Sequence, residues 1–121
     1  MSEAQRKRLE TETMAMQKMQ KEYQTLVINR QQLDSQLQEN ELVDKEFKLM
    51  KDDARVYKLT GPVLLLQDKT EAATNVEKRL EFIRSEIKRV DGRIETLAKE
   101  QEKKSVEIFK LQMDIQGISK Q

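Results

Sequence analysis

The side chains that come nearest to catalytic chemistry are the neighbouring carboxylates Asp52 and Asp53, because paired carboxyl groups can act as a general acid and base. Adjacent residues do not converge on one point, and we expect these two to be solvated near the end of a helix. The chain also has no cysteine and no histidine, which removes the thiolate nucleophile, the usual zinc ligands and the commonest general base. The sequence therefore predicts neither enzyme activity nor a cofactor.

The composition leaves little material for a globular core. Of 121 residues, 36% are hydrophobic and 4% aromatic, so we expect a single domain, residues 1–121, with a small core. The 23 basic and 22 acidic residues are interspersed, which argues against a nucleic-acid partner, including one bound by a basic helical hairpin. No apolar run is long enough to span a membrane, and the N-terminus lacks the apolar region of a signal peptide. We expect an intracellular protein without a membrane partner.

Two long stretches are typical of coiled-coil helices. Residues 3–54 contain no Gly or Pro, and residues 69–118 follow Asp68, which forms a capping-box pattern with Glu71. Both stretches repeat apolar residues at alternating spacings of three and four, which defines a seam along each helix. The first seam is Leu9, Glu12, Met16, Met19, Tyr23, Leu26, Arg30, Leu33, Leu37, Asn40, Asp44 and Phe47. The second is Val76, Leu80, Ile83, Ile87, Val90, Ile94, Leu97, Gln101, Lys104, Ile108, Leu111, Ile115 and Ile118.

Two interpretations remain open for five of the polar seam positions. A polar seam residue can specify the register of the two helices, or its long side chain can simply be partly exposed. The residues are Arg30, Asn40, Asp44, Gln101 and Lys104.

Residues 55–67 interrupt the helical pattern. Apolar residues on both sides of Gly61 and Pro62 predict two short strands joined by a turn. This linker can span at most about 45 Å, whereas each helix would be roughly 75 Å long, so the helices must pair antiparallel. The predicted fold class is mainly α: a long antiparallel two-helix coiled-coil hairpin whose helices are joined by a short β-hairpin used for oligomerisation.

The linker is too apolar to stand alone in water. A lone two-stranded hairpin is marginal, its outer edges are unpaired, and burying each Val or Leu is worth roughly 1.5 to 3 kcal/mol. We therefore expect linker strands from several chains to pair edge to edge into a closed or nearly closed sheet; the alternative is an apolar loop without fixed structure. The predicted assembly residues are Val56, Tyr57, Leu59, Gly61, Pro62, Val63, Leu64, Leu65 and Leu66.

Near its end, the second helix carries another apolar stripe beside its seam. Val106, Phe109 and Met113 recur at spacings of three and four on the outer face, which a paired coiled coil would leave in water. The first helix adds Met14, Met16 and Met19, and methionine forms adaptable contact surfaces. Exposed apolar patches usually mark binding sites. The alternative is that the stripe packs against a neighbouring helix pair or a fixed partner.

The linker and the start of the second helix together resemble β-class prefoldin. The residues that carry this resemblance are 56–64, VYKLTGPVL, and 75–83, NVEKRLEFI. The resemblance implies a cytoplasmic complex of six chains, two of α class and four of β class, whose linker strands form a double β-barrel from which the coiled coils hang. It further implies an ATP-independent chaperone that holds non-native chains such as actin and tubulin at its tips and delivers them to the cytosolic chaperonin.

By position, the resemblance assigns client contacts to the tips of the helices, where the first helix begins and the second ends. These residues are Leu9, Met14, Met16, Met19, Ile108, Phe109, Leu111, Met113 and Ile115, and the outer stripe adds Val106 to the predicted client contacts. A different class of function, a structural coiled-coil tether between two fixed protein partners, would need the helices but not a self-associating linker. Whether the chain enters a larger complex distinguishes the two hypotheses.

Overall fold

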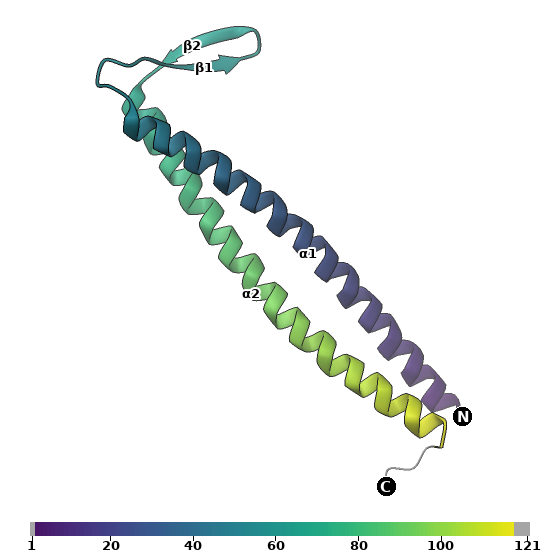
Figure 1. Cartoon of the computed structure of the whole chain (residues 1–121). Helices are drawn as coiled ribbons and strands as arrows, with labels where there is room; N and C mark the ends of the chain where they lie inside the picture. Colours follow the sequence, from purple (N-terminus) through teal and green to yellow (C-terminus); the bar gives the residue numbers. More distant parts are fainter. Residues whose placement is uncertain (1, 118–121) are drawn as a thin grey trace. The chain divides into compact units, whose positions relative to one another are not determined.

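The computed structural model describes residues 2–117, and its architecture is mainly helical. Helix α1 (Glu3–Leu49) is followed by strand β1 (Val56–Thr60), strand β2 (Val63–Gln67) and helix α2 (Lys69–Ile115) (Figure 1). The two strands pair antiparallel and form the connection between the helices. This order confirms the predicted fold class of two long helices joined by a short β-hairpin.

Helix α1 ends at Leu49, five residues before the predicted end at residue 54. Its end is fixed by a contact from the start of α2: the Lys69 ammonium donates hydrogen bonds to the carbonyl oxygens of Lys51 and Met50, at 2.8 and 3.5 Å. A cation at this position satisfies carbonyl groups that lack helical partners, and the negative charges of Asp52 and Asp53 disfavour further helix there. Residues 50–55 therefore form a turn.

Helix α2 ends at Ile115, close to the predicted stop at Gly117. Gly117 has a φ of +70°, and its N–H donates to the carbonyl oxygen of Asp114 at 3.1 Å, which is typical of a glycine that terminates a helix. Residue 118, where the helix was predicted to end, lies outside the described residues.

Side-chain caps fix the beginnings of both helices. The Asp68 carboxylate accepts a hydrogen bond from the backbone N–H of Glu71 at 2.9 Å, so the predicted cap of α2 is present. At the start of α1, Ser2 and Gln5 form a reciprocal capping box, with side chain to backbone distances of 3.0 and 3.1 Å. The Ser2 box was not among the predictions, although its S-x-x-Q spacing is visible in the sequence.

The chain divides into two compact units, each built from parts of both helices. The terminal unit contains residues 2–29 and 90–117, and the hairpin unit contains residues 30–89. Within the terminal unit, the beginning of α1 lies beside the end of α2 (Figure 1). Glu12 contacts Lys104 and Glu22 contacts Arg93, so the two helices run antiparallel there. In the hairpin unit, Lys69 donates to the carbonyl oxygen of Met50 and Arg79 donates to Asn40, so the chain segments run antiparallel there as well.

The predicted seams form the interface between the helices. Every seam residue within 2–117 is buried or half-buried. On α2 the buried seam residues are Val76, Leu80, Ile83, Val90, Leu97 and Leu111, whereas on α1 only Leu26 is buried. Ala72, one turn before the predicted start of the second seam, is also buried. The core is therefore a thin apolar layer that α2 supplies more fully than α1.

Two glycines should respond to alanine in opposite directions. Gly92 lies inside α2, and an added Cβ would meet no atom within 4 Å, so Gly92→Ala should stabilise the chain by about 1 kcal/mol through higher helix propensity. Gly61 has a φ of +59° in the hairpin turn, and Gly61→Ala should cost about 1 kcal/mol because an alanine is strained there. Chemical unfolding followed by circular dichroism measures both. A destabilised Gly92→Ala chain would contradict the open helix surface described for that position.

Candidate functional site

The β-hairpin presents one face made entirely of large apolar side chains. The register pairs Tyr57 with Leu66 and Leu59 with Leu64, which places these four side chains on the same face of the sheet. Each of them is between 52 and 67% exposed. The other face pairs Val56 with Gln67, Lys58 with Leu65 and Thr60 with Val63, so it is mixed in polarity. The hairpin therefore has an apolar face and a mixed face.

A two-residue turn sets this register. Thr60 pairs with Val63, so Gly61 and Pro62 are the only residues of the loop. Glycine at the first of two loop positions, with a positive φ, is the arrangement that a type II′ turn requires. Gly61 and Pro62 therefore act by fixing which residues share a face.

The sheet has two strands within the described part of the chain, so each strand keeps one edge without a neighbouring strand. Of the residues predicted to mediate assembly, Val56 is half-buried, and the others are exposed. Such edges readily accept a strand from another chain. The structure thus brings the predicted assembly residues together on one short, open sheet.

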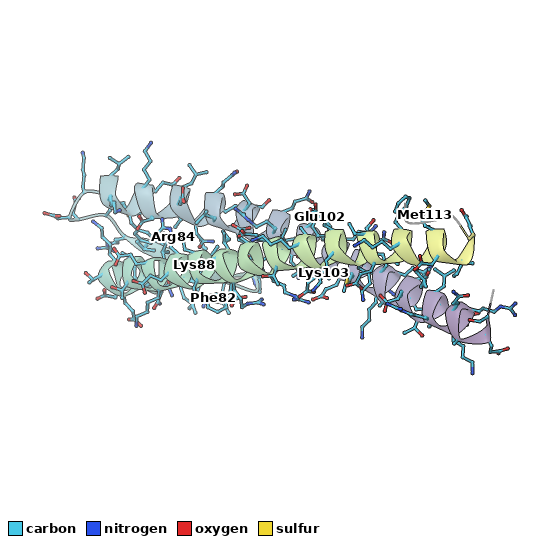
Figure 2. All side chains as sticks on the ribbon, turned by 90° about the horizontal axis from the view of Figure 1, so that it is seen from below. Phe82, Arg84, Lys88, Glu102, Lys103 and Met113 are labelled. Carbon is cyan, nitrogen blue, oxygen red and sulfur yellow. The ribbon has the colours of Figure 1, made fainter. Side chains whose placement is uncertain are left out.

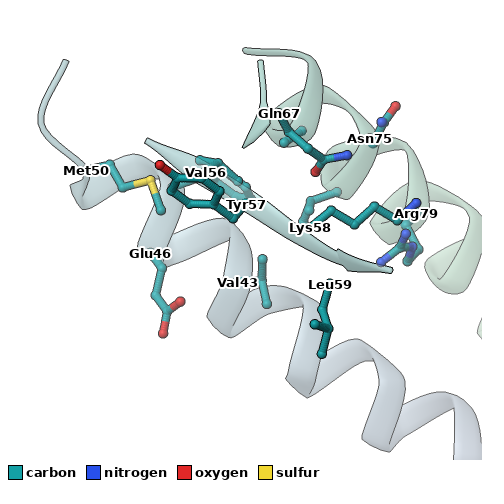
Figure 3. A pocket seen from close by; sticks show the side chains of 13 residues that line it. Val43, Glu46, Met50, Val56, Tyr57, Lys58, Leu59, Gln67, Asn75 and Arg79 are labelled. Atoms are coloured by element: carbon teal, nitrogen blue, oxygen red, sulfur yellow. The ribbon is translucent and has the colours of Figure 1, made fainter. Parts of the chain in front are cut away.

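An open hollow of about 490 Å³ lies between the hairpin and the helices of the hairpin unit. Val43 of α1, Met50 just after α1, and Tyr57 and Leu59 of β1 line it, together with Arg79 of α2 (Figure 3). Sequence reasoning did not identify this hollow, because it depends on how the strands fold back over the helices. Its lining is mixed, because it includes Lys58 and Gln67 of the hairpin as well as the apolar Tyr57 and Leu59.

The predicted client-contact residues all lie in the terminal unit, but their exposure differs. Met14, Val106 and Phe109 are exposed, and Leu111 is buried in the seam between the helices. The remaining predicted contacts are half-buried: Leu9, Met16, Met19, Ile108, Met113 and Ile115. Met14 of α1 and Val106 and Phe109 of α2 are therefore the most accessible of the predicted client contacts.

Charged side chains surround the outer stripe of α2. Val106 lies in a shallow groove that is lined by Lys99, Glu102, Lys103, Glu107 and Lys110. Glu102 and Lys103 project from α2 in the part of the helix that precedes Met113 (Figure 2). An apolar strip with a charged rim is the usual composition of a protein-binding surface.

Two ion pairs connect the helices of the terminal unit. Arg93 donates hydrogen bonds from Nε and Nη2 to the two carboxylate oxygens of Glu22, at 2.9 and 3.1 Å, which lowers the pKa of Glu22 and raises that of Arg93. Lys104 Nζ donates to Glu12 Oε2 at 2.6 Å, which lowers the pKa of Glu12 and raises that of Lys104. Both pairs are consequently charged at neutral pH.

One of the polar seam contacts crosses between the helices as an ion pair. Lys104 and Glu12 were both seam positions, and their contact supports the interpretation that a polar seam residue specifies register. Asp44 instead pairs with Lys48 on its own helix at 2.9 Å, and Arg30 lies 3.8 Å from Asp34. Those contacts fit partly exposed side chains.

Several exposed apolar residues outside the predicted sites were missed. Leu42 and Phe82 are 64 and 65% exposed in the hairpin unit, and Phe82 projects from the surface of α2 (Figure 2). Ile28 is exposed in the terminal unit. The signal available in the sequence was an apolar residue away from the seam. Single exposed apolar residues are common on protein surfaces and do not by themselves define a site.

The carboxylates Asp52 and Asp53 are exposed in the turn after α1. Within residues 2–117, no three His, Cys, Asp or Glu side chains are grouped so that they can hold a metal ion. Neither helix in this part of the chain combines the length and the apolar character needed to cross a membrane.

Comparisons with known proteins agree with this architecture. A family model described as prefoldin subunit matches residues 3–115. Prefoldin subunit 6 of Saccharomyces cerevisiae is 47% identical over 95 residues, which cover 78% of this chain and 83% of the yeast protein. Prefoldin subunit 6 of Homo sapiens is 36% identical over 116 residues, which cover 96% of this chain and 90% of the human protein.

A solved structure has the same fold. The crystal structure of the prefoldin beta subunit from Thermococcus strain KS-1 matches with a TM-score of 0.74 and covers 84% of this chain and 89% of that chain, at 19% sequence identity. The resemblance to β-class prefoldin, in particular to subunit 6, is thus confirmed by sequence and by fold. With two long helices, a β-hairpin between them and a family match over nearly its whole length, this chain belongs to the prefoldin subunit family.

Proposed function

We propose that this chain is a β-class subunit of a hexameric, ATP-independent prefoldin holdase in the cytoplasm, with residues 1–121 acting as one domain. The observation that carries this proposal is the hairpin, whose Tyr57, Leu59, Leu64 and Leu66 form one apolar face that is exposed in the single chain. Membership of the prefoldin subunit family supports the proposal.

The hairpin is the proposed assembly site. When hairpins from several chains pair edge to edge, the free strand edges gain hydrogen-bond partners. The same pairing encloses the apolar faces and removes them from water. We expect the apolar face to point into this closed sheet and the mixed face, which carries Lys58, Thr60 and Gln67, to point outward. The partners would be five further prefoldin subunits, giving two of α class and four of β class.

The terminal unit is the proposed client-binding site. Met14, Val106 and Phe109 offer exposed apolar contacts that are individually weak, and several tips in one complex would bind a single non-native chain at several points. Such binding needs no nucleotide, because holding a non-native chain depends on mass action rather than on bond cleavage. The proposed clients include non-native actin and tubulin, which the complex would deliver to the cytosolic chaperonin.

A structural tether between fixed partners accounts less well for the molecule. A tether uses the helix pair and has no need for a hairpin whose apolar face requires other chains. The exposed face of Tyr57, Leu59, Leu64 and Leu66 therefore favours the chaperone subunit.

Leucines 64 and 65 allow a matched test of assembly. Leu64→Ser should weaken entry into the complex by about tenfold or more, because Leu64 lies on the apolar face opposite Leu59. Leu65→Ser, opposite Lys58 on the mixed face, should have a clearly smaller effect. Each variant competes with isotope-labelled wild-type chain for limiting partner subunits, and chromatography followed by mass spectrometry gives the incorporated ratio. Equal incorporation of the two variants would be inconsistent with an enclosed apolar face.

The outer stripe of α2 allows a test of client binding. Replacing Val106, Phe109 and Met113 together with Ser should reduce the protection of aggregating actin by severalfold, because the accessible apolar contacts are lost. The control is Leu42→Ser combined with Phe82→Ser, which removes exposed apolar side chains of the hairpin unit. Unchanged protection by an intact complex that carries the triple variant would rule out the stripe as the client surface.

A further inference from the structure

The two strands of the hairpin are joined to their helices by links of different length. Strand β2 ends at Gln67 and α2 begins at Lys69, so Asp68 alone separates them. Helix α1 ends at Leu49, and residues 50–55 lie between it and β1. A short link restricts the strand that it carries more than a long link does. The position of β1 therefore depends on the contacts that residues 50–55 make.

Lys69 connects the two links at the base of the hairpin. Its ammonium donates hydrogen bonds to the carbonyl oxygens of Lys51, at 2.8 Å, and Met50, at 3.5 Å, and we call these two contacts the Lys69 bridge. The Lys51 carbonyl oxygen also accepts a hydrogen bond from the backbone N–H of Ala54 at 3.0 Å. A carbonyl oxygen has two lone pairs, so it can accept both bonds. The bridge therefore holds the turn before β1 against the first residue of α2.

The charge of Lys69 suits α1 and not the helix that contains it. Lys69 is the first residue of α2, where the partial positive charge of the helix N-terminus disfavours a cation. The carbonyl groups of Met50 and Lys51 lie just beyond the end of α1, where partial negative charge attracts the same ammonium. Lys69 and Met50 are both half-buried. The tertiary contact, rather than helix formation, therefore accounts for a lysine at this position.

We propose that Lys69 is a positioning residue for assembly, because its bridge orders the base of the hairpin and presents the strands to neighbouring subunits in one orientation. This inference rests on the proposed assembly site and adds to it a residue that lies outside the apolar face. A lone two-stranded hairpin is marginal in water. A binding site that is ordered before its partner arrives loses less conformational freedom on binding.

The test removes the ammonium and keeps an unbranched side chain. Lys69→Met should reduce incorporation about fivefold or more, in competition with isotope-labelled wild-type chain for limiting partner subunits, because the hairpin is no longer ordered before binding. In the single chain, amide hydrogen exchange should accelerate about tenfold in residues 54–60 and stay unchanged in residues 76–87 of α2. Lys69→Arg should restore most of both properties, since a guanidinium also donates to carbonyl oxygens.

Lys48→Met is the matched control. Lys48 lies in the last turn of α1, and its ammonium contacts Asp44 of the same helix at 2.9 Å. This variant removes a lysine from the same end of α1 and leaves the Lys69 bridge in place. It should enter the complex and exchange amide hydrogens like the wild-type chain. Equal losses in the two variants would overturn the inference, because the removal of a positive charge near the end of α1 would then explain both.

Each outcome decides the inference. Faster exchange in residues 54–60 with reduced incorporation, both restored in Lys69→Arg, supports it. Normal incorporation of Lys69→Met overturns it, as do unchanged exchange in residues 54–60 and equally accelerated exchange in residues 76–87. If Lys69→Met does not fold, Lys69→Gln is judged by the same measurements. A wild-type chain that stays out of the complex would overturn the proposed function itself, so that failure is distinguished from a failure of the Lys69 variants alone.

Discussion

The hairpin has an apolar face that its own unit does not cover. Tyr57, Leu59, Leu64 and Leu66 point to one side of a two-stranded sheet, where each is more than half exposed, and each strand keeps a free edge. Full burial of side chains of this size is worth roughly 1.5 to 3 kcal/mol each, so water is an unfavourable environment for the face. Association with other hairpins would remove the apolar surface and the free edges together, and this is the role that we propose for the β-hairpin in a mainly helical chain.

The helices divide their contacts unevenly, and this division suits the proposed roles. In the hairpin unit, Ala72, Val76, Leu80 and Ile83 form a continuous buried row on α2, which gives the strands a firm base. In the terminal unit, burial stops at Leu97 and resumes at Leu111, with the Lys104 pair between them. The seam of α2 is thus continuously buried in the unit that carries the proposed assembly site, and it is interrupted in the unit that carries the proposed client site.

Much of the fold could be predicted because it depends on local patterns. The three-and-four spacing identified the seam residues, Asp68 with Glu71 identified the start of α2, and Gly61 with Pro62 identified the turn. The end of α1 was predicted too late, because it depends on Lys69, which is distant in sequence and donates to the carbonyl groups of Met50 and Lys51. The hollow beside β1 likewise depends on tertiary packing, which spacing alone does not describe. The buried Leu111, in contrast, is a seam position that the spacing did identify.

The most direct test of the central claim is native mass spectrometry of the unaltered chain, first alone and then with α-class and other β-class prefoldin subunits. If the hairpin drives assembly, the chain should appear in a complex of six subunits when these partners are present. A chain that remains monomeric with all partners available would contradict the account, because its apolar hairpin face would then be stable in water.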